Sequence, residues 1–156
     1  MLSSLGNLLA EMGSKIRFLP VTPDIGYLPE KTAERGFFVF GNKESFLRTY
    51  DISSEPEMLS TVDFDKFYLV AIHQGLCPTG GYRIHVRGIK RSAGKIETTV
   101  EFQEPEPEQM VTLAMTTPSL FFMVPRLKGE EEPPVFYFRS TGGIPLAECK
   151  PDFGQQ

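Results

Sequence analysis

The sequence is poor in the residues that build reactive centres. Its 156 residues include no tryptophan, two cysteines and two histidines, and neither a Cys-x-x-Cys nor a His-Glu-x-x-His motif occurs. A structural zinc site therefore has no ligand set, and we expect no cofactor. Cys77 and Cys149 are expected to be ordinary small hydrophobic residues rather than a disulfide, because a domain of this length has an adequate core without a crosslink.

The sequence also lacks a surplus of positive charge and a long apolar run. It has 16 Lys and Arg against 20 Asp and Glu, a formal net charge of −4. Binding to nucleic acid in general, or to an anionic membrane surface, needs a basic surplus, so neither partner is expected. No stretch approaches the roughly 18 apolar residues of a membrane span, and the first residues lack the basic and apolar regions of a signal peptide. The sequence thus predicts neither a membrane span nor an export signal.

Composition and proline placement predict one β-rich domain, at 40% hydrophobic and 23% charged residues. Residues 37–149 are expected to form this domain, with residues 1–36 as an N-terminal extension and residues 150–156 as a C-terminal tail. Leucines recur at helical spacing over residues 2–12. That segment is expected either to pack as a short amphipathic helix on the domain or on a second copy of the chain, or to fray.

One short helix and about six strands are expected. The helix covers residues 43–50, with Phe46, Leu47 and Tyr50 on one face and Asn42 as N-cap. Residues 67–72 are apolar on both faces, which predicts the central strand of a sheet. Consecutive hairpin-like connections favour antiparallel sheets folded as a β-sandwich or partly open barrel, with an α+β fold as the alternative. The other segments with strand composition are 37–40, 82–90, 95–103, 110–116, 120–124 and 135–138.

Residues 82–90 and 95–103 predict a hairpin whose loop length follows from the two-residue period of a strand. In both segments the even-numbered residues are mostly apolar and the odd-numbered ones mostly polar. The two apolar faces coincide only if the loop has an odd number of residues, and a three-residue loop at 92–94, with Gly94 at positive φ, satisfies this. A five-residue loop does so too. His85 then lies on the solvated face, which we take as its role.

The segment 77–82 joins the central strand to this hairpin. Its proline fixes φ, its two glycines permit conformations that other residues avoid, and its threonine can bond the turn backbone. A rigid turn accounts for such a segment, but glycines also let a partner's main chain approach closely. We expect the loop to bind a protein partner, with its tyrosine as the apolar contact. The expected partner-binding residues are Pro78, Thr79, Gly80, Gly81 and Tyr82.

Residues 63–126 resemble a known family. The similarity rests on Val62-Asp63-Phe64, on Pro78-Thr79-Gly80-Gly81-Tyr82-Arg83-Ile84 between two strands, on residues 105–116, and on Thr117-Pro118 leading to Pro125. This arrangement resembles the C-terminal domain of PrcB, a protease-complex subunit. The resemblance implies a non-catalytic module that associates with and stabilises a protease, with a serine protease as the implied partner and the cell envelope as the implied location.

Two alternatives to this function remain at the level of sequence. Pro78, Thr79 and Tyr82 also resemble the Asn-Pro-Thr-Thr-Gly-Tyr loop of chagasin-type cysteine-protease inhibitors, although Cys77 and Gly80 differ from it. An enzyme would need a constellation such as Cys77 with His73 or His85, but nothing indicates a lowered thiol pKa at a cysteine that precedes a proline in a turn. The carboxylates of residues 104–108 lie in an exposed proline-rich run. We therefore expect no catalytic residues.

Overall fold

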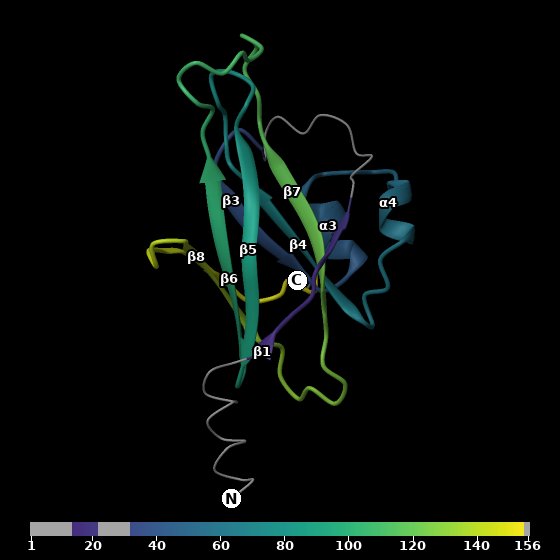
Figure 1. Ribbon diagram of the computed structural model, residues 1–156. Coiled ribbons are helices and arrows are strands. Elements are labelled where there is room, and N and C mark those ends of the chain that lie inside the picture. The colour runs from purple at the N-terminus through teal and green to yellow at the C-terminus, as the bar shows by residue number, and fades with distance from the viewer. Residues whose placement is uncertain (1–13, 22–31, 155–156) are drawn as a thin grey trace, which may run out of the picture.

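Two β-sheets pack face to face in the computed structural model, which describes residues 14–21 and 32–154. The five-stranded sheet has the order β1-β5-β6-β8-β9, and the four-stranded sheet has the order β2-β7-β4-β3 (Figure 1). The chain is mainly β, as predicted. Its elements are β1 (Ser14–Lys15), β2 (Leu19–Val21), β3 (Gly36–Phe40), α3 (Lys43–Thr49), α4 (Glu57–Ser60), β4 (Phe67–His73), β5 (Arg83–Ser92), β6 (Lys95–Gln103), β7 (Ser119–Pro125), β8 (Val135–Ser140) and β9 (Pro145–Cys149).

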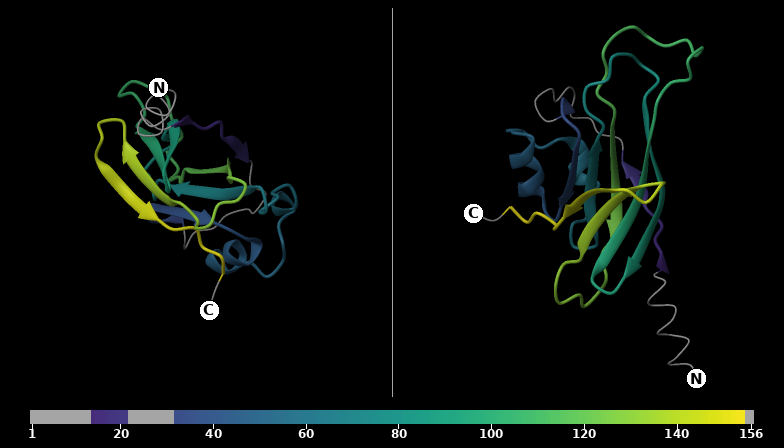
Figure 2. Two further views of the ribbon diagram at one scale, coloured as in Figure 1. Left: turned by 90° about the horizontal axis from the view of Figure 1, so that it is seen from below. Right: turned by 90° about the vertical axis from the view of Figure 1, so that its left-hand side faces the viewer.

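Strand β4 is the central strand that the sequence predicts. Its side chains alternate between two cores, because successive residues of a strand point to opposite faces. Tyr68, Val70 and Ile72 join the cluster between the sheets, whereas Leu69 and Ala71 join a second cluster beneath the helices. Every one of these five residues is fully buried. The helices α3 and α4 thus cover the outer face of the four-stranded sheet (Figures 1 and 2).

The short helix α3 also forms as predicted. The Asn42 side chain caps it, since its Oδ1 accepts a hydrogen bond of 2.9 Å from the backbone N–H of Ser45. Phe46 and Tyr50 are buried in the helix-side core, where their rings lie 4.8 Å apart. The second helix, α4, was not expected from the sequence.

The β5–β6 hairpin has the predicted faces but not the predicted loop. Its loop has two residues, Ala93 and Gly94, with Gly94 at φ +70°. A β-bulge between Val86 and Gly88 shifts the register by one residue, so that Ile84 lies opposite Phe102 and Val86 opposite Val100. The bulge therefore restores the matching parity that an odd loop was expected to provide. The outer face carries the expected cross-strand pairs, among them Arg87 with Glu101 and, at 2.5 Å, His85 with Gln103.

One strand pairing is parallel, and one predicted strand does not form. The sheets are mainly antiparallel, as predicted, but β6 and β8 pair in parallel from Lys95↔Val135 to Val100↔Ser140. Between these two strands the chain crosses to the other sheet as β7, and it returns at the end where β6 begins. Residues 110–116 do not form a strand, and only Thr116 pairs there, in an isolated bridge with Cys77.

Both open edges of the sandwich are bridged by the chain itself. Residues 14–21 pair with β5 as β1 and then with β7 as β2, although they lie in the predicted N-terminal extension. At the other edge β9 pairs with β8, and Asp152 then pairs with Phe40 of β3. The predicted amphipathic segment 2–12, with its suggested contact to a second copy, lies outside the described residues. Within the described part, no helix has the length and apolarity to cross a membrane.

A largely buried charge cluster closes the end of the sandwich opposite the 77–82 loop. Tyr68 donates a hydrogen bond of 2.9 Å to the Glu130 carboxylate, and Arg91 pairs with the same carboxylate at 3.3 Å. The Arg126 guanidinium lies over the Tyr68 ring, 4.7 Å from its centroid. Burial and the neighbouring Glu130 together raise the pKa of Tyr68, so the phenol stays protonated and donates. Glu130 thereby fixes the 126–134 loop to both sheets.

Replacing Glu130 by Gln should lower the free energy of unfolding by about 1–3 kcal/mol, because a buried arginine loses its charged partner. The exposed neighbour Glu131 provides the matched control, and Glu131→Gln should change stability by no more than about 0.5 kcal/mol. Urea denaturation of both variants measures the difference. Equal losses in the two variants would show that the cluster contributes nothing specific.

Candidate functional site

The predicted binding loop lies against a second loop at one end of the sandwich. We call residues 76–82 and 104–116 together the tip (Figures 1 and 2). Cys77 and Thr116 exchange two backbone hydrogen bonds, of 2.7 and 2.9 Å, and the N–H of Gly80 donates to the carbonyl of Thr112 at 3.0 Å. The Thr116 hydroxyl also donates to the carbonyl of Thr79 at 2.8 Å. These bonds hold the two loops to each other as one unit.

The two glycines of the tip allow this close contact between the loops. A Cβ on Gly81 would lie 2.8 Å from both Pro105 and Val111, and Gly81 has a φ of +88°. A Cβ on Gly80 would lie 2.6 Å from the hydroxyl of Thr112. The chain's own second loop therefore takes the space above the glycines that the sequence assigned to a partner's main chain. The glycines thus serve the close packing of the two loops against each other.

The remaining predicted residues of the loop are only partly accessible. Pro78 is exposed, while Thr79 and Tyr82 are half-buried. The Thr79 hydroxyl donates to the carbonyl of Gly80 at 2.9 Å, and its own carbonyl is taken by Thr116. The structure thus brings all five residues to one place, the base and side of the tip, but it does not make Tyr82 its most exposed apolar group.

The most exposed apolar side chains of the tip are ones that the sequence interpretation missed. Single exposed hydrophobic side chains are normal on protein surfaces, but several of them on one small element indicate an interaction site. Residues 110–116 were expected to form a strand because of their composition. The prolines on both sides of them, Pro105 and Pro107 before and Pro118 after, were the available signal for a loop. The exposed fractions are 97% for Met110, 89% for Leu113, 62% for Met115 and 51% for Leu76.

Acidic residues flank this apolar group. Glu104, Glu106 and Glu108 are all exposed, as expected for a solvated connection. Residues 104–118 contain no Lys or Arg. Gln109 orders the acidic stretch, because its N–H donates to the carbonyl of Glu106 and its side chain accepts from the Glu106 N–H at 3.1 Å. The tip therefore presents an apolar group beside a uniformly acidic one.

His73 lies in a hydrogen-bonded chain between two hydroxyl groups. The Tyr50 hydroxyl lies 2.6 Å from His73 Nε2, and the Ser119 hydroxyl lies 2.7 Å from Nδ1. Burial lowers the pKa of His73 to about 4, so the ring is neutral and carries one proton. When that proton is on Nδ1, His73 donates to Ser119 and accepts from Tyr50; when it is on Nε2, both hydrogen bonds run the opposite way.

The other candidate reactive groups are engaged or unactivated. Cys77 is buried, its thiol lies 3.6 Å from the carbonyl of Gly75, and burial raises the pKa of that thiol. A raised pKa leaves little thiolate at neutral pH. Both cysteines are free, as expected. Over residues 14–21 and 32–154 no group of three or more His, Cys, Asp or Glu side chains is placed to hold a metal ion.

The comparison with known families gives a match in the middle of the chain. Residues 68–125 match the PrcB C-terminal family. We call residues 68–125 the PrcB-like segment. It contains β4 from its second residue, the first loop of the tip, the β5–β6 hairpin, the second loop and β7. The resemblance found in the sequence is thus confirmed over this part of the chain. A search of the curated proteins and a search of the solved structures found no match.

The close contacts of the two tip glycines can be tested by substitution. Gly81→Ala should lower the free energy of unfolding by about 1–3 kcal/mol, because the residue has a positive φ and its Cβ would press on Pro105 and Val111. Gly80→Ala should cost less, since only the movable Thr112 hydroxyl lies closer than 3.0 Å. Gly142→Ala is the control, because its Cβ would meet only the Ser140 hydroxyl, at an ordinary contact distance of 3.8 Å, and Gly142 has no positive φ. Thermal melts that rank the three variants differently would contradict this account of the tip.

The lowered pKa of His73 predicts that the stability of the fold depends on pH. An unfolded histidine titrates near pH ~6.5, whereas folded His73 has a pKa of about 4. The unfolded state therefore binds the extra proton first, and the stability that neutral His73 contributes is complete above pH ~6.5 and lost as the pH falls toward about 4. NMR of the ring carbons should show no protonation of His73 between pH 7.5 and 5.5. A midpoint inside that range would refute the assignment of a neutral imidazole at His73.

Proposed function

We propose that this chain is a non-catalytic protein-binding module that associates with a protease, in keeping with its PrcB-like segment. The observation that carries the proposal is the exposure of Met110, Leu113 and Met115 on a loop held by hydrogen bonds to its neighbour. A rigid loop loses little conformational entropy on binding, and buried apolar anchors supply most of the energy of a protein interface. The tip is the surface that we assign to the partner.

The partner's surface at this contact should be apolar and basic. Three exposed carboxylates lie beside the apolar side chains, and opposite charge across an interface favours encounter and excludes wrong partners. A serine protease is the partner class that the sequence resemblance to PrcB implies. The chagasin-like alternative, inhibition of a cysteine protease through residues 77–82, would require that loop to enter a cleft, whereas its two glycines face the chain's own second loop.

Capture from cells of the source organism tests the proposal. The tagged wild-type chain should co-purify with a protease that mass spectrometry identifies, and Leu113→Asp should abolish this capture. Leu127→Asp is the matched control, because Leu127 is 55% exposed on the loop at the opposite end. Both variants should melt like the wild type, since surface substitutions change stability by about 0.5 kcal/mol or less.

Two results would contradict the proposal. Retention of the protease by Leu113→Asp would exclude the tip as its binding surface. Capture of proteins that include no protease would leave the tip as an interface but remove the protease-associated function.

A further inference from the structure

Two of the exposed apolar side chains of the tip are methionines, whose sulfur atoms can be oxidised. Met110 is 97% exposed and Met115 is 62% exposed, whereas Met58 is 4% exposed and lies in the helix-side core. Met123 on β7 is partly buried and packs against the same core. Because an oxidant in solution must reach the sulfur, these exposures favour oxidation at the tip over oxidation in the core.

The two thiols of the chain are poorly placed to react first. Cys77 is buried, and Cys149 is partly buried with its thiol 3.4 Å from the carbonyl of Phe37. Burial raises the pKa of both thiols, so little of either is present as the thiolate, which is the form that oxidants attack. The thioethers of the tip are therefore the most accessible sulfur groups in the described part of the chain.

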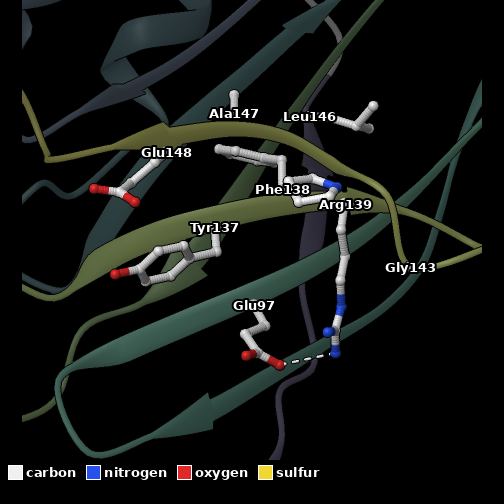
Figure 3. A pocket seen from close by; sticks show the side chains of 9 residues that line it. Glu97, Tyr137, Phe138, Arg139, Gly143, Leu146, Ala147 and Glu148 are labelled. Atoms are coloured by element: carbon white, nitrogen blue, oxygen red, sulfur yellow. Dashed lines mark hydrogen bonds and ion pairs between the residues drawn. The ribbon is translucent and has the colours of Figure 1, made fainter.

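Other exposed surfaces of the molecule offer nothing to such an oxidant. Figure 3 shows a hollow of about 410 Å³ beside β9, where the Arg139 guanidinium meets the Glu97 carboxylate at 3.0 Å. None of the residues that line this hollow contains sulfur. Leu127 and Ile144 are exposed apolar side chains away from the tip, and they contain none either. Oxidation of exposed sulfur thus acts on the described surface at the tip.

Oxidation changes what the tip presents to a partner. Hydrogen peroxide transfers one oxygen atom to the methionine sulfur: its O–O bond breaks, an S–O bond forms, the sulfur gives up two electrons, and the peroxide leaves as water. The product is a sulfoxide, which is polar where the thioether was apolar. Met110 and Met115 are two of the three apolar side chains on which the proposed contact rests. Burying an unpaired polar group in an interface is unfavourable, so the contact is lost.

The fold of the tip does not depend on these two sulfur atoms. Its loops are joined by backbone bonds between Cys77 and Thr116 and between Gly80 and Thr112, and by the Thr116 hydroxyl. No methionine side chain takes part in these bonds, and neither Met110 nor Met115 belongs to the two apolar clusters of the core. Oxidation should therefore change the binding surface and leave its support intact.

We propose that Met110 and Met115 are sites of reversible oxidation that controls partner binding at the tip. A hydroperoxide converts both thioethers to sulfoxides, and the partner dissociates. A thiol-dependent reductase reverses the step: the S–O bond breaks, the oxygen leaves as water, and two thiols are oxidised to a disulfide. This inference rests on the function proposed for the tip. It adds that the module holds its protease in the absence of peroxide and releases it under oxidation.

Peroxide treatment of the tagged full chain tests the switch. The chain is treated, freed of peroxide and then mixed with untreated lysate of the source organism. Peptide mass spectrometry should find sulfoxide at Met110 and Met115 before Met58, and the melting temperature should not change. The captured amount of the protease identified with the untreated chain should fall by at least about tenfold.

Two double variants separate the tip from the rest of the chain. Met110→Leu with Met115→Leu keeps two apolar side chains of similar volume without sulfur, so it should capture the protease equally before and after treatment. This variant retains Met1 and Met12, so their oxidation is controlled for. Met110→Gln with Met115→Gln imitates the polar sulfoxides and should fail to capture the protease even without peroxide.

Reduction of the treated wild type provides the last test. Methionine sulfoxide reductase with dithiothreitol should restore capture, whereas dithiothreitol alone should not. Recovery with dithiothreitol alone would assign the effect to the cysteines and overturn the switch.

The remaining outcomes also decide the matter. Undiminished capture by the oxidised wild type, or an equal loss in the double leucine variant, would overturn the switch. So would loss of capture by the untreated leucine variant, because binding would then need sulfur rather than an apolar side chain. If the untreated wild type captures no protease, the proposed function fails and the switch fails with it. Failure of the switch alone leaves that capture intact, so the two failures are distinguished.

Discussion

The burial of strand β4 on both faces is the constraint on which the rest of the structure depends. One set of its side chains needs a second sheet, and the other set needs the helices, so neither layer is dispensable. A strand with two apolar faces is stable only when both are covered. Because the helices cover one sheet, the other sheet keeps its outer face open. The same constraint that builds the core thus determines which face is left uncovered.

The sequence predicts those elements whose patterns are local. The alternation in the β5–β6 hairpin, the doubly apolar β4 and the Asn42-capped helix are each specified within about ten residues, and each forms. The loop length of the hairpin failed for a physical reason. The apolar residues of the two strands must lie on the same face, and the bulge at Gly88 achieves this with a two-residue loop. The alternation of apolar and polar residues alone does not distinguish such a bulge from a longer loop.

The tip was only half predictable for a different reason. Pro78 and the two glycines mark a special turn in any context, and the turn is there. What lies above the glycines is decided by residues 32 to 39 positions later, through the Gly80–Thr112 bond and the Cys77–Thr116 bridge. Strand-like composition at residues 110–116 gave the opposite indication. The β-propensity of a segment describes how well its side chains fit a sheet, so it predicts a strand only where a neighbouring strand is available. At residues 110–116 no neighbouring strand pairs along the segment.

The position of the tip follows from the length and register of the hairpin. Strand β5 is ten residues long, but β1 pairs with it only at Arg91 and Lys90. The rest of β5 therefore extends past β1 toward the tip, and it pairs there only with β6. The bulge between Val86 and Gly88 restores the register in which Ile84 and Val86 lie opposite Phe102 and Val100. Because those four residues share one face, the bulge lets a hairpin with a two-residue loop keep its apolar side toward the core over the half of β5 that carries the tip.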